Sequence, residues 1–421
     1  MLSSDFDTMR IRKTALSTLA ETLNSFFWSA LSRRWVVTLL LMLICIPFFE
    51  PGSLGSWGTP HLAGLFYYWK IASAFAVFFL FLFTAEKERF SSVALCLSFT
   101  ILLSCSLNDG GVKTWFEDWA MFSAAILLVS STYKCHLREL LLAVLVISTA
   151  IALCNLVSIF LYPNGVYDSG GAKQDHFFYG HRNKFFHFVI PSVGCSLLLD
   201  YLSGRHCSIR TILLALLGGS QFLLCYSATS CLAAIVAIAL LLACLIQLKT
   251  RRKPFNGLSV LVTIALIFLA VVVLRMQDLA APFIVEVLDK TTTFTGRTIV
   301  WDRTISLMDD NHMLLGYGTN AVRLLSFNGL VYYHTHNEML WVWFVGGYAA
   351  LLLFSLLLVF SAWSLFKARD TPLAALLTPI FACFLVIMLM EISECFAFPF
   401  FLGLFFYLPK IASREKRMPD F

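Results

Sequence analysis

Long runs of apolar residues, separated by short polar turns, dominate the pattern of this chain. The runs are about 15 to 24 residues long and lack the alternation of a barrel strand, so they predict membrane-spanning helices. The expected spans cover residues 35–50, 62–84, 90–107, 115–132, 139–162, 185–202, 209–226, 229–247, 256–274, 338–361, 372–390 and 395–409. The pattern therefore predicts an all-α, polytopic membrane domain at residues 35–409, with about twelve transmembrane helices.

Residues 1–34 show a different pattern. Apolar residues recur at helical spacing from Leu16 to Ala30, and basic residues lie on both sides of them. This favours a cytoplasmic amphipathic helix on the membrane surface, and a partly disordered basic tail is the alternative for residues 1–14. No apolar run directly follows the first charges, so a cleavable signal peptide is not expected.

Composition and charge agree with a membrane domain and suggest its orientation. The chain has 59% hydrophobic and 13% charged residues, with a mean hydropathy of +0.80, which excludes an ordinary soluble domain. If the N-terminus is cytoplasmic, the cytoplasmic segments, including the tail at residues 410–421, hold 21 of the 31 Lys and Arg residues. This bias predicts that both termini are inside and two long loops outside. The net charge of +6 thus reflects topology, and no nucleic-acid partner is expected.

The twelve cysteines lie almost wholly in or beside the expected spans, and none form a Cys-x-x-Cys pair. The sequence therefore indicates neither a zinc site nor a disulfide framework. Cys225 and Cys231 flank a short external turn, where they either pair or are buried as small apolar residues.

The first long external loop, residues 162–184, ends in a cluster of polar side chains at the mouth of the next helix. Arg182 and Lys184, on either side of Asn183, are expected at the outer membrane surface. Because basic residues are disfavoured on that side, their presence suggests an anionic ligand. The alternative is that Arg182 pairs with Asp175 or with a lipid phosphate.

The second external loop, residues 275–336, is longer than most uninterrupted connections, and such loops are usually functional or disordered. A helix is predicted to begin at residues 295–296, with an apolar face formed by Trp301, Ile305 and Met308. Arg297 would lie in its first turn, which is unfavourable to the helix dipole unless an anion binds there too. The alternative is an ion pair between Arg297 and Asp302, Asp309 or Asp289.

Two histidines precede the next span, for which Asn337 is the expected N-cap. His334 and His336 lie two residues apart and would face the same way in an extended segment. Such a pair could suit a metal, but no third or fourth ligand is apparent, so no metal and no cofactor are expected. One neutral imidazole could instead act as a general base, or the histidines could be polar residues of the membrane interface.

These motifs together resemble the signature of the O-antigen ligase and polymerase superfamily. The resemblance covers roughly residues 160–360 and rests on the order Gly296-Arg297-Thr298, Trp301, a glycine-rich turn at Gly316-Tyr317-Gly318, His336-Asn337-Glu338 and Gly346-Gly347. Gly180-His181-Arg182-Asn183 resembles a further family segment. The stretch at residues 226–232 is similar to the family's serine-rich turn but lacks its Ser-Arg pair, which leaves open whether another residue, such as Arg182, supplies that positive charge.

The resemblance implies metal-independent, inverting glycosyl transfer at the extracytoplasmic face of the bacterial cytoplasmic membrane. The donor would be an oligosaccharide on a polyprenyl diphosphate, and the acceptor a glycan or a lipid-linked molecule within the membrane. Arg297 and Arg182 would neutralise the leaving diphosphate. His336 would be the base, with Glu338 and Asn337 as orienting groups and His334 as the alternative base. The further substrate-binding residues would be Asn337, His334, Asn183, Trp301 and Lys184.

Three functions are weighed. The expected one is polymerisation of repeat units of an O-antigen, capsule or exopolysaccharide. A ligase would instead transfer the glycan to lipid A core or another carrier. A twelve-helix transporter or lipid-glycan flippase is the alternative from another class, favoured only by ionisable residues in or beside spans, namely Lys70, Glu391 and Glu394.

Overall fold

A computed structural model describes residues 34–56, 60–84, 86–108, 111–166, 176–205, 207–276, 296–326, 332–393 and 396–415. Its helices are α2 (Arg34–Cys45), η1 (Ile46–Phe49), α3 (Ser53–Ser56), α4 (Pro60–Thr84), α5 (Arg89–Leu107), α6 (Val112–Trp115), η2 (Phe116–Ala120), α7 (Met121–Thr132), α8 (Leu137–Leu161), η3 (Arg182–Lys184), α9 (Phe186–Leu202), α10 (Ile209–Leu224), α11 (Ala228–Gln247), α12 (Gly257–Phe268), η4 (Leu269–Val273), α13 (Arg297–Leu307), η7 (Ala321–Leu325), α14 (Glu338–Lys367), α15 (Pro372–Met388) and α16 (Ala397–Glu415). Apart from an isolated bridge between His176 and His181, these residues form no β-structure. The predicted all-α class is confirmed.

Each expected span coincides with a helix or a run of consecutive helices. Six of the helices among the described residues are long and apolar enough to cross a membrane, and shorter apolar helices accompany them. The count of twelve spans stays a prediction. Side chains at the starts of several helices accept a backbone N–H, as N-caps do; Ser208, Asn256, Asn337 and Thr371 are examples.

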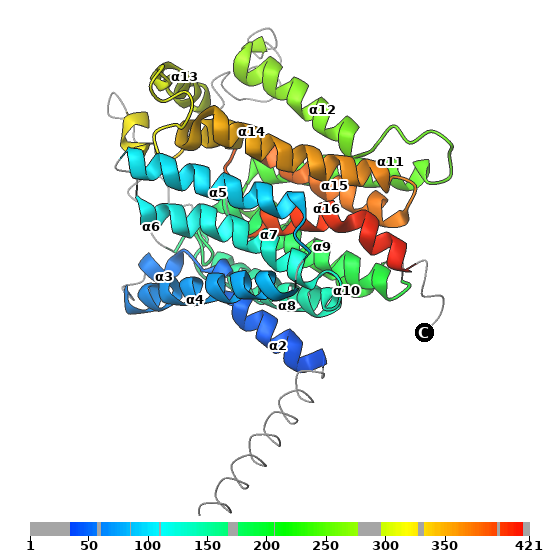
Figure 1. Cartoon of the computed structure of the whole chain (residues 1–421). Coiled ribbons are helices and arrows are strands. Elements are labelled where there is room, and N and C mark those ends of the chain that lie inside the picture. The colour runs from blue at the N-terminus through cyan, green and yellow to red at the C-terminus, as the bar shows by residue number, and fades with distance from the viewer. Residues whose placement is uncertain are drawn as a thin grey trace, which may run out of the picture.

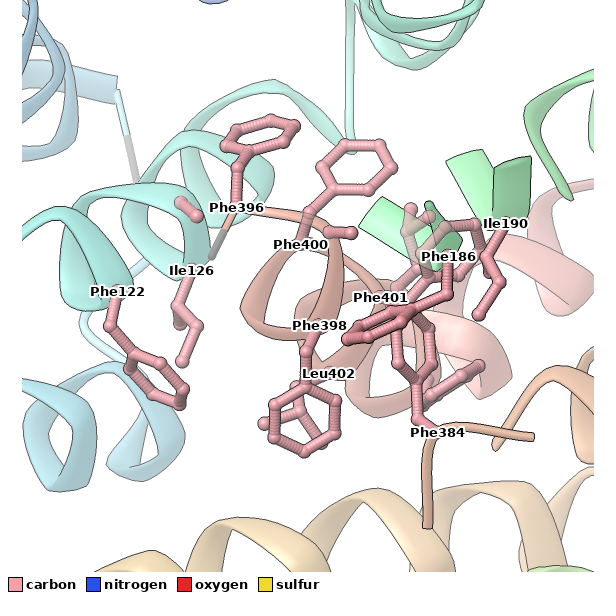
Figure 2. Close-up of a cluster of buried hydrophobic side chains, with 14 of the residues drawn as sticks. Phe122, Ile126, Phe186, Ile190, Phe384, Phe396, Phe398, Phe400, Phe401 and Leu402 are labelled. Carbon is pink, nitrogen blue, oxygen red and sulfur yellow. The ribbon is translucent and has the colours of Figure 1, made fainter. Parts of the chain in front are cut away.

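Helix α16 forms the centre of the bundle. It is apolar from Ala397 to Leu408, and four of its five phenylalanines are fully buried, which is typical of a helix surrounded by others. Figure 2 shows Phe398 and Phe401 of this helix among side chains from α7, α9 and α15. Phe384 lies 5.4 Å from Phe398 and 5.7 Å from Phe401 between ring centroids. This aromatic core fixes the helices whose ends carry the polar residues described below.

The helices lie side by side, so that their turns gather at two ends of the bundle (Figure 1). One end, which we call the site end, carries α3, α6 and α13. At the opposite end, ion pairs join the turns between helices. Lys410 of α16 contacts both Glu86 and Glu88, and Lys134 contacts Glu86.

Helix α14 is kinked where the chain reads Gly346-Gly347. Gly347 has φ +65° and ψ −166°, a conformation that glycine adopts at little cost. The segment 313–318 packs onto the kink, and its backbone exchanges hydrogen bonds with the helix. Tyr317 N–H donates to Phe344 O at 2.8 Å, and Tyr348 N–H donates to Met313 O at 2.8 Å. The predicted flexible turn at residues 316–318 is therefore fixed to α14.

Several expectations receive a definite outcome from this fold. Cys225 and Cys231 are free thiols, so they do not pair. Lys70 forms an ion pair with Glu50 at 2.5 Å, which accounts for a charge within an expected span. The amphipathic segment before residue 34, together with residues 169, 175, 289, 295 and 394, lies outside the described residues.

Candidate functional site

The segment before α9 is held in place by buried polar residues of α8. Tyr179 N–H donates to the Asn155 carboxamide oxygen at 2.9 Å, and Phe178 N–H donates to the Ser158 hydroxyl at 3.0 Å. The chain then turns through η3, where the His181 imidazole accepts the N–H of Asn183 at 3.3 Å. As predicted, this polar segment lies at the mouth of α9 and reaches the site end.

Helix α13 begins at Arg297 after Gly296, whose φ of +86° is left-handed. Arg275 fixes the helix from outside: it donates to Thr298 O at 3.2 Å, pairs with Asp302 and lies 5.3 Å above the Trp301 ring. Asp302 is therefore not a partner of Arg297. Asp309, a second acid weighed for that role, pairs with His312 at 2.6 Å, and Asp289 lies outside the described residues.

The segment leading into α14 is tightly turned and not extended. His336 has φ +51°, which is uncommon for a residue with a side chain. Its N–H donates to His334 Nδ1 at 3.1 Å, and the two imidazoles lie edge to face at 4.1 Å. Asn337 then caps α14 by accepting the Leu340 N–H at 3.0 Å. The predicted cap is confirmed, whereas the expected extended approach is wrong.

Glu391, in the turn after α15, joins all three segments. Its Oε1 accepts a hydrogen bond from Asn183 Nδ2 at 2.7 Å and forms an ion pair with the Arg297 guanidinium. Its Oε2 lies 3.4 Å from Nδ1 of His336, longer than a typical N–H···O bond. Only 10% of the Glu391 side chain is exposed, so these donors provide the hydrogen bonds that water would provide to an exposed carboxylate.

The charges around Glu391 set two protonation states. Burial by itself raises the pKa of Glu391, but the hydrogen bond from His336 and the charge of Arg297 lower it to about 2. Burial, together with the neighbouring charges of His336, Lys184 and Arg297, lowers the pKa of His334 to about 3. Near neutral pH, Glu391 is thus an anion and His334 is uncharged, which agrees with Nδ1 of His334 accepting a hydrogen bond.

An ionised carboxylate can only accept hydrogen bonds. Nδ1 of His336 must therefore carry the proton that faces Glu391, which leaves the Nε2 lone pair free to take another proton. The His336 side chain is 30% exposed, so a substrate can reach it. A carboxylate that fixes the tautomer of a histidine is the arrangement used by hydrolytic triads.

The same residues could also hold a metal ion. One ligand atom each from His334, His336 and Glu391 lie within 4.8 Å of one another. Two histidines and a glutamate are a known catalytic zinc set, and Glu391 is the third ligand that the sequence analysis lacked. Arg297 binds the same carboxylate, however, and its charge opposes that of a cation.

Two of the residues expected at the site, Glu338 and Trp301, are engaged elsewhere. Glu338 does not contact His336: it is fully buried and accepts the N–H of Ser393. Trp301 is fully buried in the core, so it supports α13 and is not available to a substrate. Arg182 donates to the Cys225 carbonyl at 3.0 Å, so its guanidinium lies at the end of α10. The predicted apolar face of α13 is only partly correct, because Ile305 is 41% exposed.

The central residue that sequence reasoning did not assign to the site is Glu391. It appeared only as an acid beside a span and was weighed in favour of transport. A usable signal was present, because the expected spans put this turn on the same side as the two long loops, whose basic residues need a counter-charge. Nothing in the sequence alone selected Glu391 over Glu394.

Comparison with known proteins agrees with these motifs. Residues 213–355 match the family model described as O-antigen ligase. This stretch contains Arg297, His334, His336 and Asn337, and it ends before Glu391. No curated protein matches the chain. The match covers about a third of the chain, and it supports the O-antigen ligase superfamily that the motifs resemble.

Proposed function

We propose that this protein transfers an oligosaccharide from a polyprenyl diphosphate to an acceptor hydroxyl, with inversion at the anomeric carbon. The observation that carries the proposal is the contact of one buried carboxylate, Glu391, with both Arg297 and His336. A cation for a leaving diphosphate and a base for an attacking hydroxyl are thus held side by side. These are the two groups that a displacement at a glycosyl diphosphate requires.

In the proposed step, Nε2 of His336 takes the proton of the acceptor hydroxyl while its oxygen attacks the anomeric carbon. The bond between this carbon and the diphosphate oxygen breaks, and the bonding electrons leave with the diphosphate. Arg297 stabilises the negative charge that develops there, and its guanidinium has further N–H groups beside the one that binds Glu391. Lys184, whose charge acts on His334, adds to the positive potential.

The proposed reaction in the cell is polymerisation of a surface polysaccharide, with a second lipid-linked glycan as acceptor. Transfer to lipid A core or another carrier is the second candidate, favoured by the description of the matched family as O-antigen ligase. Deleting the gene and separating the surface glycans on a gel distinguishes the two. A polymer ladder that collapses to one repeat supports a polymerase, and lipid-linked polymer that never reaches its carrier supports a ligase. An unchanged glycan pattern contradicts both.

We further propose that the site faces the outside of the bacterial cytoplasmic membrane, because the described turns at the opposite end carry the larger share of basic residues. Single cysteines introduced in a cysteine-free background test this. Asn311→Cys, in an exposed turn at the site end, should react with an impermeant maleimide on intact cells. Lys249→Cys, exposed at the opposite end, should react only after lysis. The reverse pattern would put the site in the cytoplasm.

A further inference from the structure

A cavity of about 520 Å³ opens at the site end next to Glu391. Its walls come from η1, α3 and α4 on one side and from η2 and the start of α7 on another. The remaining wall is formed by the segment before α9 and by Ile392 and Phe396, which follow Glu391. His181 and Lys184 lie in this wall, directly beside the Asn183 that binds Glu391. The cavity and the candidate site therefore share a wall.

The cavity presents acceptors and donors together. Glu50, Glu117 and Asp118 supply carboxylates, Lys70 and Lys184 supply ammonium groups, and Tyr179 supplies an aromatic ring. His187 also lines it, is only 7% exposed, and its Nε2 has no hydrogen-bond partner among the described residues. An unpartnered buried polar atom in the wall of a cavity is unusual in a folded protein.

The backbone of the η2 wall is itself unusual. Phe116–Ala120 is a π-helical turn between α6 and α7, and such turns are rare and frequent at functional sites. The wider turn carries two neighbouring acids, Glu117 and Asp118, into the same cavity wall. The π-turn is thus a second feature of this cavity, independent of His187.

We infer that this cavity binds sugar units of a glycan substrate, an inference that rests on the proposed function. Hydroxyl groups of a pyranose both donate and accept, so they can bind carboxylates, ammonium groups and a neutral imidazole in one pocket. The volume lies within the range of small-molecule pockets. Phe48, Phe396 and Tyr179 supply apolar surface for the C–H faces of a sugar ring.

The charges argue against the diphosphate as the occupant. Three carboxylates face two ammonium groups in the cavity, and one of these, Lys70, is already paired with Glu50. Acidic side chains thus outnumber ammonium groups in this lining, whereas Arg297, which does not line the cavity, offers a diphosphate a cation beside Glu391. The cavity therefore takes the uncharged, polyhydroxylated part of the substrate.

Binding of the free glycan tests the inference directly. The probe is the oligosaccharide released by mild acid from the strain's own lipid-linked repeat unit, and saturation-transfer NMR measures its affinity for the full-length protein in nanodiscs. Glu117→Gln should weaken binding about tenfold to a hundredfold, since it removes a charged acceptor, and His187→Asn should do so too. Asp310→Asn, an exposed acid outside the cavity, is the matched control.

Equal affinity of Glu117→Gln, His187→Asn and the control would overturn the inference and leave the proposed function standing. Conversely, Arg297→Lys should lose most of the transfer activity but keep oligosaccharide binding, so a failure of the chemistry is measured separately. Kinetics assign the glycan to one substrate. If Glu117→Gln raises the KM for acceptor and spares hydrolysis of the donor by water, the cavity holds the acceptor. If both reactions slow equally, it holds the donor.

Discussion

Replacing Glu391 by Gln removes the charge that joins Arg297 to His336 and keeps the shape of the side chain. The carboxylate is buried, and its pKa is lowered from 4.5 to about 2. A shift of this size corresponds to about 3 kcal/mol of favourable interaction in the folded state. Because the folded-state pKa is depressed, this contribution is complete above about pH 4.5 and is lost as the pH falls toward 2.

At neutral pH, Glu391→Gln should therefore lower both stability and turnover. A neutral amide stabilises the Nδ1–H tautomer of His336 less than a carboxylate does. A smaller fraction of His336 then has the free Nε2 lone pair that the base needs. We expect kcat to fall by two to four decades, the range of a lost general base. The assay is single-turnover transfer in nanodiscs with lipid-linked glycan extracted from the deletion strain, alongside thermal unfolding of each variant.

The matched control is Glu139→Gln. Glu139 is a buried acid, 8% exposed, that lies 3.8 Å from Arg34 and far along the chain from any residue of the site. It should lose stability and keep its turnover per folded molecule. If Glu391→Gln turns over within tenfold of wild type, or if the control loses as much, then Glu391 is merely structural and the orienting role is refuted.

Three further predictions concern the arginine, a metal and the helix kink. Arg297→Lys should lose most of the activity that Arg297→Ala loses, because an ammonium lacks the forked geometry of a guanidinium. The loss corresponds to about 2 to 4 kcal/mol of transition-state stabilisation. The control Arg323→Lys, at an exposed position of η7, should retain activity in the same transfer assay. A chelator should leave turnover unchanged, and loss of activity that a divalent cation restores would reassign the two histidines as metal ligands. Gly347→Ala should unfold at lower temperature, because φ is +65° and a Cβ would lie 2.3 Å from Leu314 O, whereas Gly219→Ala meets nothing within 4 Å.

The sequence predicted the helices well because each depends on a long, local signal. Apolar runs of this length have few alternatives, and the Asn337 cap needs only the next three residues. The start of α13 was likewise predictable, since Gly296 precedes a helical pattern.

The site was predicted only in part, because its centre depends on contacts distant in sequence. Arg297 and His336 were expected from the motifs, but Glu391 lies 94 residues from one and 55 from the other along the chain. Glu338 was preferred because it is adjacent to the histidine, although the helix turns its carboxylate toward Ser393. Trp301 was misassigned because a conspicuous aromatic residue can equally well serve the core.

The kink in α14 also constrains how this protein could be re-engineered. Inside a bilayer, backbone groups released by a broken helix must find partners, and here segment 313–318 supplies them. Exchanging the loop that contains segment 313–318 with that of another protein would leave the helix without these partners unless Gly346 and Gly347 were exchanged as well. The unit of exchange is thus the loop together with α14 up to the kink at Gly347, and chimeras cut at the start of α14 should fail to fold.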